Sequence, residues 1–267
     1  MRLKFWMILV EGVLLVLAIS AIIAAVNIWQ SSADKNMAGG CQATLVIGRS
    51  AEGIPIEACQ LNGSDPQAGN VLLVVGSIHG DEPDGKRVVD ALLSNVAPVG
   101  SNIWLIRDGN PDGALLGTRR NANEVDINRN FPVKWLASDP AARTYSGPSP
   151  ASEPETIALM SAVEKIAPTQ IVVFHQPYEL IDCPPERPST ISDRLSQLTG
   201  YKSECIPGEK SGSPTNSYTG TFTIWVNSTF PNATAVTFEL GVTTMDAKIT
   251  TISQALRVLA AEKAYLP

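Results

Sequence analysis

Three runs of mostly apolar residues, each about as long as a β-strand, constrain the fold of this chain more than any other feature. They are VLLVV at 71–75, IVVF at 171–174 and AVTF at 235–238. Such runs, bounded by turn residues, are typical of buried strands. Segments with helical spacing alternate with them, at 83–96, 152–166, 189–200 and 245–265. This alternation predicts one α/β domain with a central mixed, largely parallel twisted sheet and helices on both faces.

The start of the chain has a different composition. Residues 5–29 contain a single charged side chain, Glu11, and about 20 apolar residues suffice for a helix to cross a bilayer. Arg2 and Lys4 precede this run, and a tryptophan lies near each of its ends. Positive charges favour the cytoplasmic side and tryptophans favour the interface, so the run indicates a membrane helix with its N-terminus inside.

We therefore predict a cytoplasmic N-terminus at 1–4, a transmembrane anchor at 5–29, a linker at 30–40 and a globular domain at 41–267 that lies outside the cytoplasm. On this hypothesis the N-terminal helix attaches the chain to the membrane. A cleaved signal peptide is the alternative, because SSA at 31–33 has the small residues that a signal peptidase uses. In both cases the globular domain is exported.

The four cysteines agree with export, because disulfides are the default in an oxidising compartment. Four cysteines allow three pairings, and the simplest joins sequence neighbours, Cys41 with Cys59 and Cys183 with Cys205. Free structural cysteines are the alternative. The sequence contains no CxxC pair, so a zinc–thiolate site is not expected.

Composition excludes two broad classes of protein. Hydrophobic residues make up 44% and charged residues 17% of the chain, which is not the composition of a disordered protein. The net charge is −6 and no basic cluster stands out, which argues against nucleic acid as the main partner.

Both histidines of the chain stand at the ends of predicted buried strands, as does one glutamate. They are His79, His175 and Glu239. Ligands of open α/β sheets collect at the carboxyl ends of the strands, so we expect these side chains to lie close together. Glu82 follows His79 by three residues, across a strand-to-helix turn. Two histidines and one glutamate with an open fourth position form a catalytic zinc arrangement, for which Glu239 is the candidate general base.

Each of these residues also has a purely structural interpretation. His79 is suited to a helix N-terminus where it bonds to backbone, and Glu82 to a first turn where it favours the helix dipole. His175 is suited to a buried core position with satisfied hydrogen bonds. Taken together, the residues favour a metal site. Gly80 is a candidate for permitting the tight turn, and Asp81 for supporting the ligands, but the sequence does not decide either role.

Six motifs, in order, resemble those of the zinc metallocarboxypeptidase family, and within it the branch that acts on peptidoglycan. They span about residues 71–250 and are GSIHGDE (76–82), NPDG (110–113), LGTRRNANEVDINRNFP (116–132), SEPETIAL (152–159), VVFHQP (172–177) and TFELG (237–241). The resemblance implies a carboxypeptidase-like fold and one bound zinc ion. Its ligands would be His79, Glu82 and His175, with Glu239 as base and proton shuttle.

The resemblance also implies substrate-binding residues. Asn128 and Arg129 match the pair that binds the terminal carboxylate of the substrate, and Arg119 matches the arginine that stabilises the oxyanion. A guanidinium suits both tasks because it donates paired hydrogen bonds. Arg120 stands where a small residue is expected, and it is a candidate for contacting an acidic substrate or for exchanging roles with Arg119. Tyr218 lies in about the stretch that, in pancreatic members, carries a tyrosine that folds over the substrate.

The leading hypothesis is a membrane-anchored zinc exopeptidase that faces the cell envelope. It would hydrolyse an amide beside a free carboxylate, and the resemblance suggests a peptide or muropeptide substrate such as the γ-D-glutamyl–diaminopimelate bond of peptidoglycan stem peptides. An N-acyl amino acid deacylase of the succinylglutamate desuccinylase/aspartoacylase type is the enzymatic alternative, although NPDG and SEPET favour the peptidase. The alternative from another class is a non-catalytic wall-binding domain on a membrane tether.

Overall fold

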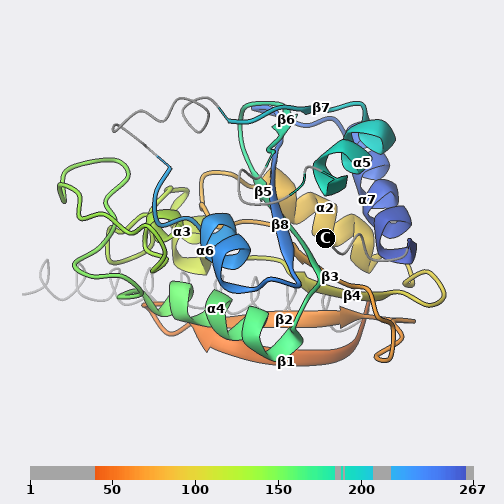
Figure 1. Ribbon diagram of the computed structural model, residues 1–267. Coiled ribbons are helices and arrows are strands. Elements are labelled where there is room, and N and C mark those ends of the chain that lie inside the picture. Colours follow the sequence, from red (N-terminus) through yellow and green to blue (C-terminus); the bar gives the residue numbers. More distant parts are fainter. Residues whose placement is uncertain (1–39, 184–187, 189, 207–217, 263–267) are drawn as a thin grey trace, which may run out of the picture. The chain divides into compact units, whose positions relative to one another are not determined.

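The computed structural model describes residues 40–183, 188, 190–206 and 218–262 (Figure 1). The predicted cytoplasmic N-terminus, the predicted anchor at 5–29 and nearly all of the predicted linker lie outside these residues. Among the residues that are described, no helix combines the length and the apolar character needed to cross a bilayer.

A mixed sheet forms the centre of the described domain (Figure 1). Its eight strands are β1 (Cys41–Arg49), β2 (Pro55–Leu61), β3 (Val71–Val75), β4 (Asn102–Ile106), β5 (Gln170–His175), β6 (Leu180–Ile181), β7 (Lys202–Ser203) and β8 (Thr234–Glu239). The strand order is β1-β2-β4-β3-β5-β8-β6-β7. The four central strands β4, β3, β5 and β8 run parallel, whereas β1, β2 and β6 join their neighbours in antiparallel pairs.

Helices cover both faces of the sheet (Figure 1). They are α2 (Asp84–Leu93), α3 (Pro111–Leu116), α4 (Pro154–Ile166), α5 (Thr190–Thr199), α6 (Phe222–Thr229) and α7 (Asp246–Ala261), with the 3-10 turn η1 at Ile127–Arg129. Helix α7 contacts both α2 and α5, whereas α4 packs on β1 and α6 on β8. The predicted α/β class, with its largely parallel centre, is therefore confirmed.

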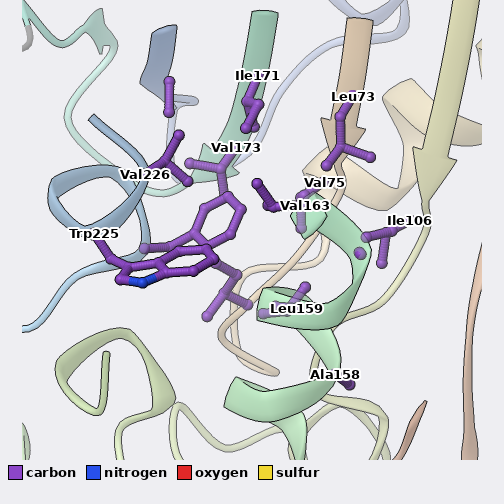
Figure 2. Packing of buried hydrophobic residues seen from close by; sticks show 14 of the residues in the cluster. Leu73, Val75, Ile106, Ala158, Leu159, Val163, Ile171, Val173, Trp225 and Val226 are labelled. Atoms are coloured by element: carbon purple, nitrogen blue, oxygen red, sulfur yellow. The ribbon is translucent and has the colours of Figure 1, made fainter. Parts of the chain in front are cut away.

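The core cluster shows why the apolar runs form buried strands. Leu73 and Val75 of β3 face the same cluster as Val173 of β5, since alternate residues of a strand share a face. Leu159 of α4 and Trp225 of α6 cover them (Figure 2). Burying an aliphatic or aromatic side chain of this size contributes about 1.5–3 kcal/mol, so these contacts fix the central strands whose ends carry the site.

Three local features differ from the sequence-based expectation. Strand β3 ends at Val75, so His79 lies in the turn that follows and not on the strand. Helices α3 and α6 are additional to the predicted ones. The S-x-x-E pattern of Ser152 and Glu155 predicts a capping box, but Glu153 is the N-cap and makes no side-chain capping bond. The carboxylate of Glu155 instead accepts a hydrogen bond from the backbone of Ala51.

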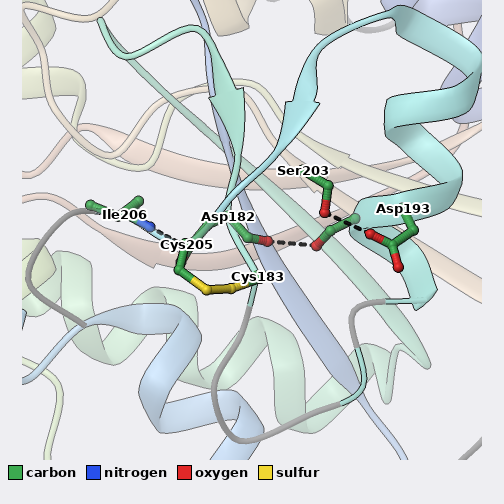
Figure 3. The surroundings of a disulfide bond; sticks show 7 residues. Asp182, Cys183, Asp193, Ser203, Cys205 and Ile206 are labelled. Carbon is green, nitrogen blue, oxygen red and sulfur yellow. Dashed lines mark hydrogen bonds between the residues drawn. A yellow bond between two sulfur atoms is a disulfide. The ribbon is translucent and has the colours of Figure 1, made fainter. Parts of the chain in front are cut away.

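Two disulfides join the cysteines that are neighbours in the sequence, as predicted. Cys41 and Cys59 link β1 to β2, with Cα atoms 5.5 Å apart. Cys183 and Cys205 link the segments that follow β6 and β7, with Cα atoms 4.6 Å apart. Beside the second bond, the carboxylate of Asp182 accepts a hydrogen bond from the backbone of Ile206 (Figure 3). A covalent bond therefore joins the segments after the last two strands at this edge of the sheet, next to β8, the strand that ends in Glu239.

Candidate metal centre

Two adjacent parallel strands and one turn bring the predicted ligands together. His175 is the last residue of β5, and its register partner on β8 is Glu239, the last residue of that strand. The neighbouring strand β3 leads into the turn that carries His79 and Glu82. The four side chains thus lie together at the carboxyl edge of the sheet, which is the position predicted from the sequence.

The three predicted ligands converge on one point. The Nδ1 atoms of His79 and His175 are 3.1 Å apart. Oε2 of Glu82 lies 3.0 Å from Nδ1 of His79 and 2.9 Å from Nδ1 of His175. All three residues are buried. Burial opposes ionisation of Glu82, but the attraction of His79 and a hydrogen bond from His175 outweigh it and hold the pKa of this carboxyl well below its usual range.

A close backbone contact positions the turn between His79 and Glu82. A Cβ atom on Gly80 would lie 2.0 Å from the carbonyl carbon of Gly113, in the NPDG motif. Asn110 caps α3 by accepting a hydrogen bond from Gly113 N, 3.0 Å away. The GSIHGDE and NPDG motifs therefore form one packed unit, and glycine at position 80 serves a close approach of two backbones.

The outward nitrogens of both imidazoles contact side chains of the VDINRNF segment. Nε2 of His79 lies 3.1 Å from Oδ1 of Asp126, and Nε2 of His175 lies 3.2 Å from Nδ2 of Asn128. Asn128 is itself held by Phe222, whose backbone N–H donates to Oδ1 at 2.9 Å. Helix α6 thereby orients Asn128 toward the cleft.

Arg119 lies directly beside the ligand atoms. Its Nη1 is 3.2 Å from Oε1 of Glu82 and 3.1 Å from Nδ1 of His79. Its Nε donates to Oδ2 of Asp126 at 2.9 Å. Burial disfavours the charged guanidinium, yet the carboxylates of Asp126 and Glu82 outweigh this effect and raise its pKa. A permanent positive charge therefore faces the cleft.

Arg129 is a buried cation whose hydrogen-bonding capacity is not used up. Nη1 donates to the backbone oxygen of Asn128 at 2.7 Å, but buried Nε has no partner among the described residues. Burial lowers the pKa of this guanidinium. The Tyr218 ring lies 5.4 Å from its central carbon. Because a buried donor without a partner is costly, this arginine is prepared to receive an anionic ligand.

Glu239 differs from the other buried carboxyl groups of the site. Its side chain is 6% exposed, and burial together with the nearby charge of Glu82 raises its pKa to about 7. The backbone N–H of Tyr178 lies 3.5 Å from Oε2 and opposes this shift only in part. A carboxyl group with a pKa near neutrality can accept a proton and return it within one reaction cycle.

All these groups line one pocket of about 280 Å³. Its lining includes eight of the nine predicted site residues, namely His79, Glu82, Arg119, Asn128, Arg129, His175, Tyr218 and Glu239. Arg120 is not among the residues that line it. The guanidinium of Arg120 instead faces the backbone oxygens of Pro140, Ala142 and Arg143.

Comparison with known proteins agrees with this geometry. A profile of the zinc carboxypeptidases matches residues 40–248, which is more than half of the chain. The chain belongs to the zinc carboxypeptidase family. Murein peptide amidase A of Escherichia coli K12 is 33% identical over 162 residues, or 56% of this chain and 65% of that protein. The chain thus spans just under two thirds of the length of this curated relative.

Solved structures share the fold over a larger part of the chain. The crystal structure of murein-tripeptide amidase MpaA from Escherichia coli O157 has a TM-score of 0.68 and 27% identity, and the match covers 85% of this chain and 95% of that one. The structure of bovine thrombin-activatable fibrinolysis inhibitor has a TM-score of 0.67 and 17% identity, and the match covers 89% of this chain and 94% of that one. The second likeness shows the fold alone.

The zinc carboxypeptidase family implies zinc, and the donor atoms of this chain fit it. In a tetrahedral site with bonds of about 2.0–2.1 Å, neighbouring donor atoms lie roughly 3.3 Å apart. The donor atoms of His79, Glu82 and His175 are 2.9–3.1 Å apart. Two nitrogens and one oxygen are also the donor types that zinc accepts. These three residues would therefore hold the ion.

The sequence-based assignment missed the most buried carboxylate of this zinc carboxypeptidase site. Asp126 is fully buried and contacts both His79 and Arg119. Asp81, the residue considered for this supporting role, has a side chain that is 34% exposed and faces Arg143. The signal for Asp126 was its place two residues before Asn128, inside a motif already noted for substrate binding.

Proposed function

We propose that this protein is a zinc-dependent carboxypeptidase or amidase that hydrolyses an amide bond next to a free carboxylate. The observation that carries the proposal is that Arg129, a buried guanidinium whose Nε has no partner in the described part of the chain, lines the same pocket as the three converging ligands. A site for a carboxylate thus lies beside a site for one metal ion. A non-catalytic wall-binding domain needs neither the ligand triad nor a carboxyl group poised like Glu239.

Each residue has a distinct part in the reaction. Arg129 and Asn128 bind the terminal carboxylate by directed hydrogen bonds, which places the scissile amide over the ligand triad. Zinc, when bound, supplies a Lewis acid that polarises a carbonyl and lowers the pKa of water. Glu239 takes a proton from the attacking water and delivers it to the leaving nitrogen. Arg119 donates hydrogen bonds to the oxygen on which negative charge develops.

The substrate class follows from the relatives. Murein peptide amidase A and murein-tripeptide amidase MpaA are named for peptidoglycan peptides. We therefore propose the γ-D-glutamyl–diaminopimelate bond of peptidoglycan stem peptides as the bond that is cleaved. Tyr218 would cover the bound substrate, because its ring lies over Arg129 at the wall of the pocket.

Product analysis by mass spectrometry tests this proposal. The purified protein is incubated with defined stem peptides and, in parallel, with N-acyl amino acids, each with and without a chelator. We expect release of diaminopimelate-containing product from the stem peptide, and loss of this release when the chelator is present. Cleavage of the N-acyl amino acids alone would favour a deacylase, and no cleavage of either would favour a binding domain.

We also propose that residues 5–29 anchor the protein in a membrane and that the catalytic domain faces the cell envelope. The two disulfides support an oxidising compartment. The test is membrane fractionation combined with protease treatment of intact spheroplasts. Degradation of the domain by protease added outside the cells is expected, whereas degradation only after lysis contradicts the proposal.

A further inference from the structure

The pocket has a third arginine in its lining besides Arg119 and Arg129, and none of the roles above uses it. Arg143 and Thr144 line it from the segment between η1 and α4. The side chain of Arg143 is 69% exposed, whereas Arg129 is only 8% exposed. Besides Arg119 next to the ligand atoms, the pocket therefore offers the buried guanidinium of Arg129 in its wall and the exposed guanidinium of Arg143 at its solvent edge.

The two arginines lie beside different parts of the site. Arg129 contacts the ring of Tyr218. Nη2 of Arg143 lies 3.5 Å from Oδ2 of Asp81, the residue before the ligand Glu82. Exposed ion pairs of this kind contribute only about 0–1 kcal/mol. The pair with Asp81 therefore leaves the Arg143 side chain available for a ligand.

The backbone that carries Arg143 is held on both sides. Arg120 donates from Nε to the Arg143 oxygen at 3.3 Å, and its other nitrogens face the oxygens of Pro140 and Ala142. Immediately after this segment, the oxygen of Tyr145 accepts a hydrogen bond of 2.8 Å from the backbone of Asp126. The Arg143 side chain thus projects from a fixed point, although its end is exposed.

We propose that Arg143 is a specificity-determining residue that binds a second carboxylate, on the acyl side of the scissile amide. This inference rests on the proposed function. A γ-glutamyl amide retains a free α-carboxylate on its acyl part, so such a substrate carries one anion on each side of the bond. Arg129 takes the carboxylate of the leaving amine component. The acyl component then extends past the ligand triad toward the Asp81–Arg143 edge of the pocket.

The exposure of Arg143 sets the size of its effect. A hydrogen-bonded ion pair between arginine and carboxylate is stronger than a neutral hydrogen bond, but solvent at an exposed position screens it. We expect a preference of roughly fivefold in kcat/KM for a substrate that bears the α-carboxylate, which corresponds to about 1 kcal/mol for an exposed pair.

A matched pair of substrates isolates this contact. One is a γ-D-glutamyl–diaminopimelate peptide with a free α-carboxylate, and the other is the same peptide with that group converted to a carboxamide. The unmodified protein should prefer the free acid. Arg143→Gln should lower kcat/KM for the free acid to the value for the amide and leave the amide unchanged. Arg143→Lys, which keeps the charge, should retain part of the preference.

Arg49→Gln serves as the matched control, because Arg49 bonds to the backbone of Gly53 in a turn and does not line the pocket. It should show the same preference as the unmodified protein. Zinc content and circular dichroism confirm that each variant is folded. Equal losses on both peptides in Arg143→Gln, or no preference in the unmodified protein, overturn the role of Arg143. Cleavage of neither peptide by the unmodified protein overturns the proposed function as well.

Discussion

Nε2 of His79 lies 3.1 Å from Oδ1 of Asp126, on the side of the ring opposite the nitrogen that faces Glu82. Asp126 is fully buried, and its second oxygen accepts a hydrogen bond from Arg119. Burial opposes its ionisation, but the attraction of His79 and Arg119 holds its pKa far below the usual range. One carboxylate thus orients both a candidate ligand and the candidate oxyanion donor.

Replacing Asp126 by asparagine should therefore weaken zinc binding. A carboxylate partner fixes the orientation and raises the basicity of a ligating histidine, and its loss typically costs 10–100-fold in metal affinity. Zinc affinity can be measured by competition with a chelating indicator. Asp65→Asn is the control, because this aspartate is exposed and its side chain accepts a hydrogen bond from the backbone of Gln67, away from the site. Unchanged zinc affinity in Asp126→Asn would show that His79 does not depend on this contact.

Glu239→Gln should retain zinc and lose nearly all turnover. The substitution preserves shape but removes the group that accepts and returns the proton, and such groups typically contribute 10²–10⁴-fold to rate. The measurements are kcat on a stem peptide and zinc content of the same sample. Glu164→Gln, on the exposed surface of α4, is the matched control. Retained activity in Glu239→Gln would refute the assignment of the base.

The predictable part of the site depends on strand order. His175 and Glu239 end parallel strands that pair with each other, so their apolar runs alone place them at one edge of the sheet. His79 lies beyond the end of its strand, and the turn that brings it back is fixed by packing against Gly113. The structure brings the predicted residues together, but the geometry of the turn depends on a contact with another segment.

The rest of the site could not be predicted because it depends on packing between distant segments. Helix α6 has few sequence signals of its own, yet its N-terminus orients Asn128 through Phe222 N. The S-x-x-E pattern at 152–155 predicted a helix cap, but the Glu155 carboxylate bonds to Ala51 and Asn121 instead. Tertiary partners therefore overrode a local motif.

The raised pKa of Glu239 predicts how the stability of the metal-free protein changes with pH. Burial and the nearby charge of Glu82 raise this pKa to about 7, above the usual glutamate value of 4.5. Between pH 4.5 and about pH 7 the folded state binds more protons at this carboxyl group than the unfolded state does. Its contribution to the free energy of unfolding therefore falls as the pH rises through this range. Glu239→Gln should therefore stabilise the chelator-treated protein by up to about 3 kcal/mol near pH 8 and have little effect near pH 4.5.

Urea unfolding of both chelator-treated proteins at the two pH values checks this expectation. All other titrating groups are common to the two proteins, so the difference between them isolates position 239. An equal change in the free energy of unfolding at both pH values would contradict a raised pKa in the folded state.

Asn121 links the SEPET segment to the loop that carries Arg119 and Asp126. Its Nδ2 donates to Glu153 at 2.7 Å and to Glu155 at 2.8 Å, whereas its Oδ1 accepts from the backbone of Val125 at 3.0 Å. All three polar side chains are buried. Asn121→Ala should therefore remove a donor from two buried carboxylates and cost about 1–3 kcal/mol or more of stability.

The same substitution should lower kcat/KM, because it releases the loop that positions Arg119 beside the ligands. Urea unfolding and kinetics on a stem peptide measure the two effects, with Asn95→Ala as control. Asn95 is exposed just beyond the end of α2, and its side chain donates to the backbone oxygen of Ala91. Glu153→Gln and Glu155→Gln should each be milder than Asn121→Ala, since glutamine still offers an oxygen to Asn121. If Asn121→Ala destabilises the protein no more than Asn95→Ala, the loop is held by its backbone contacts alone.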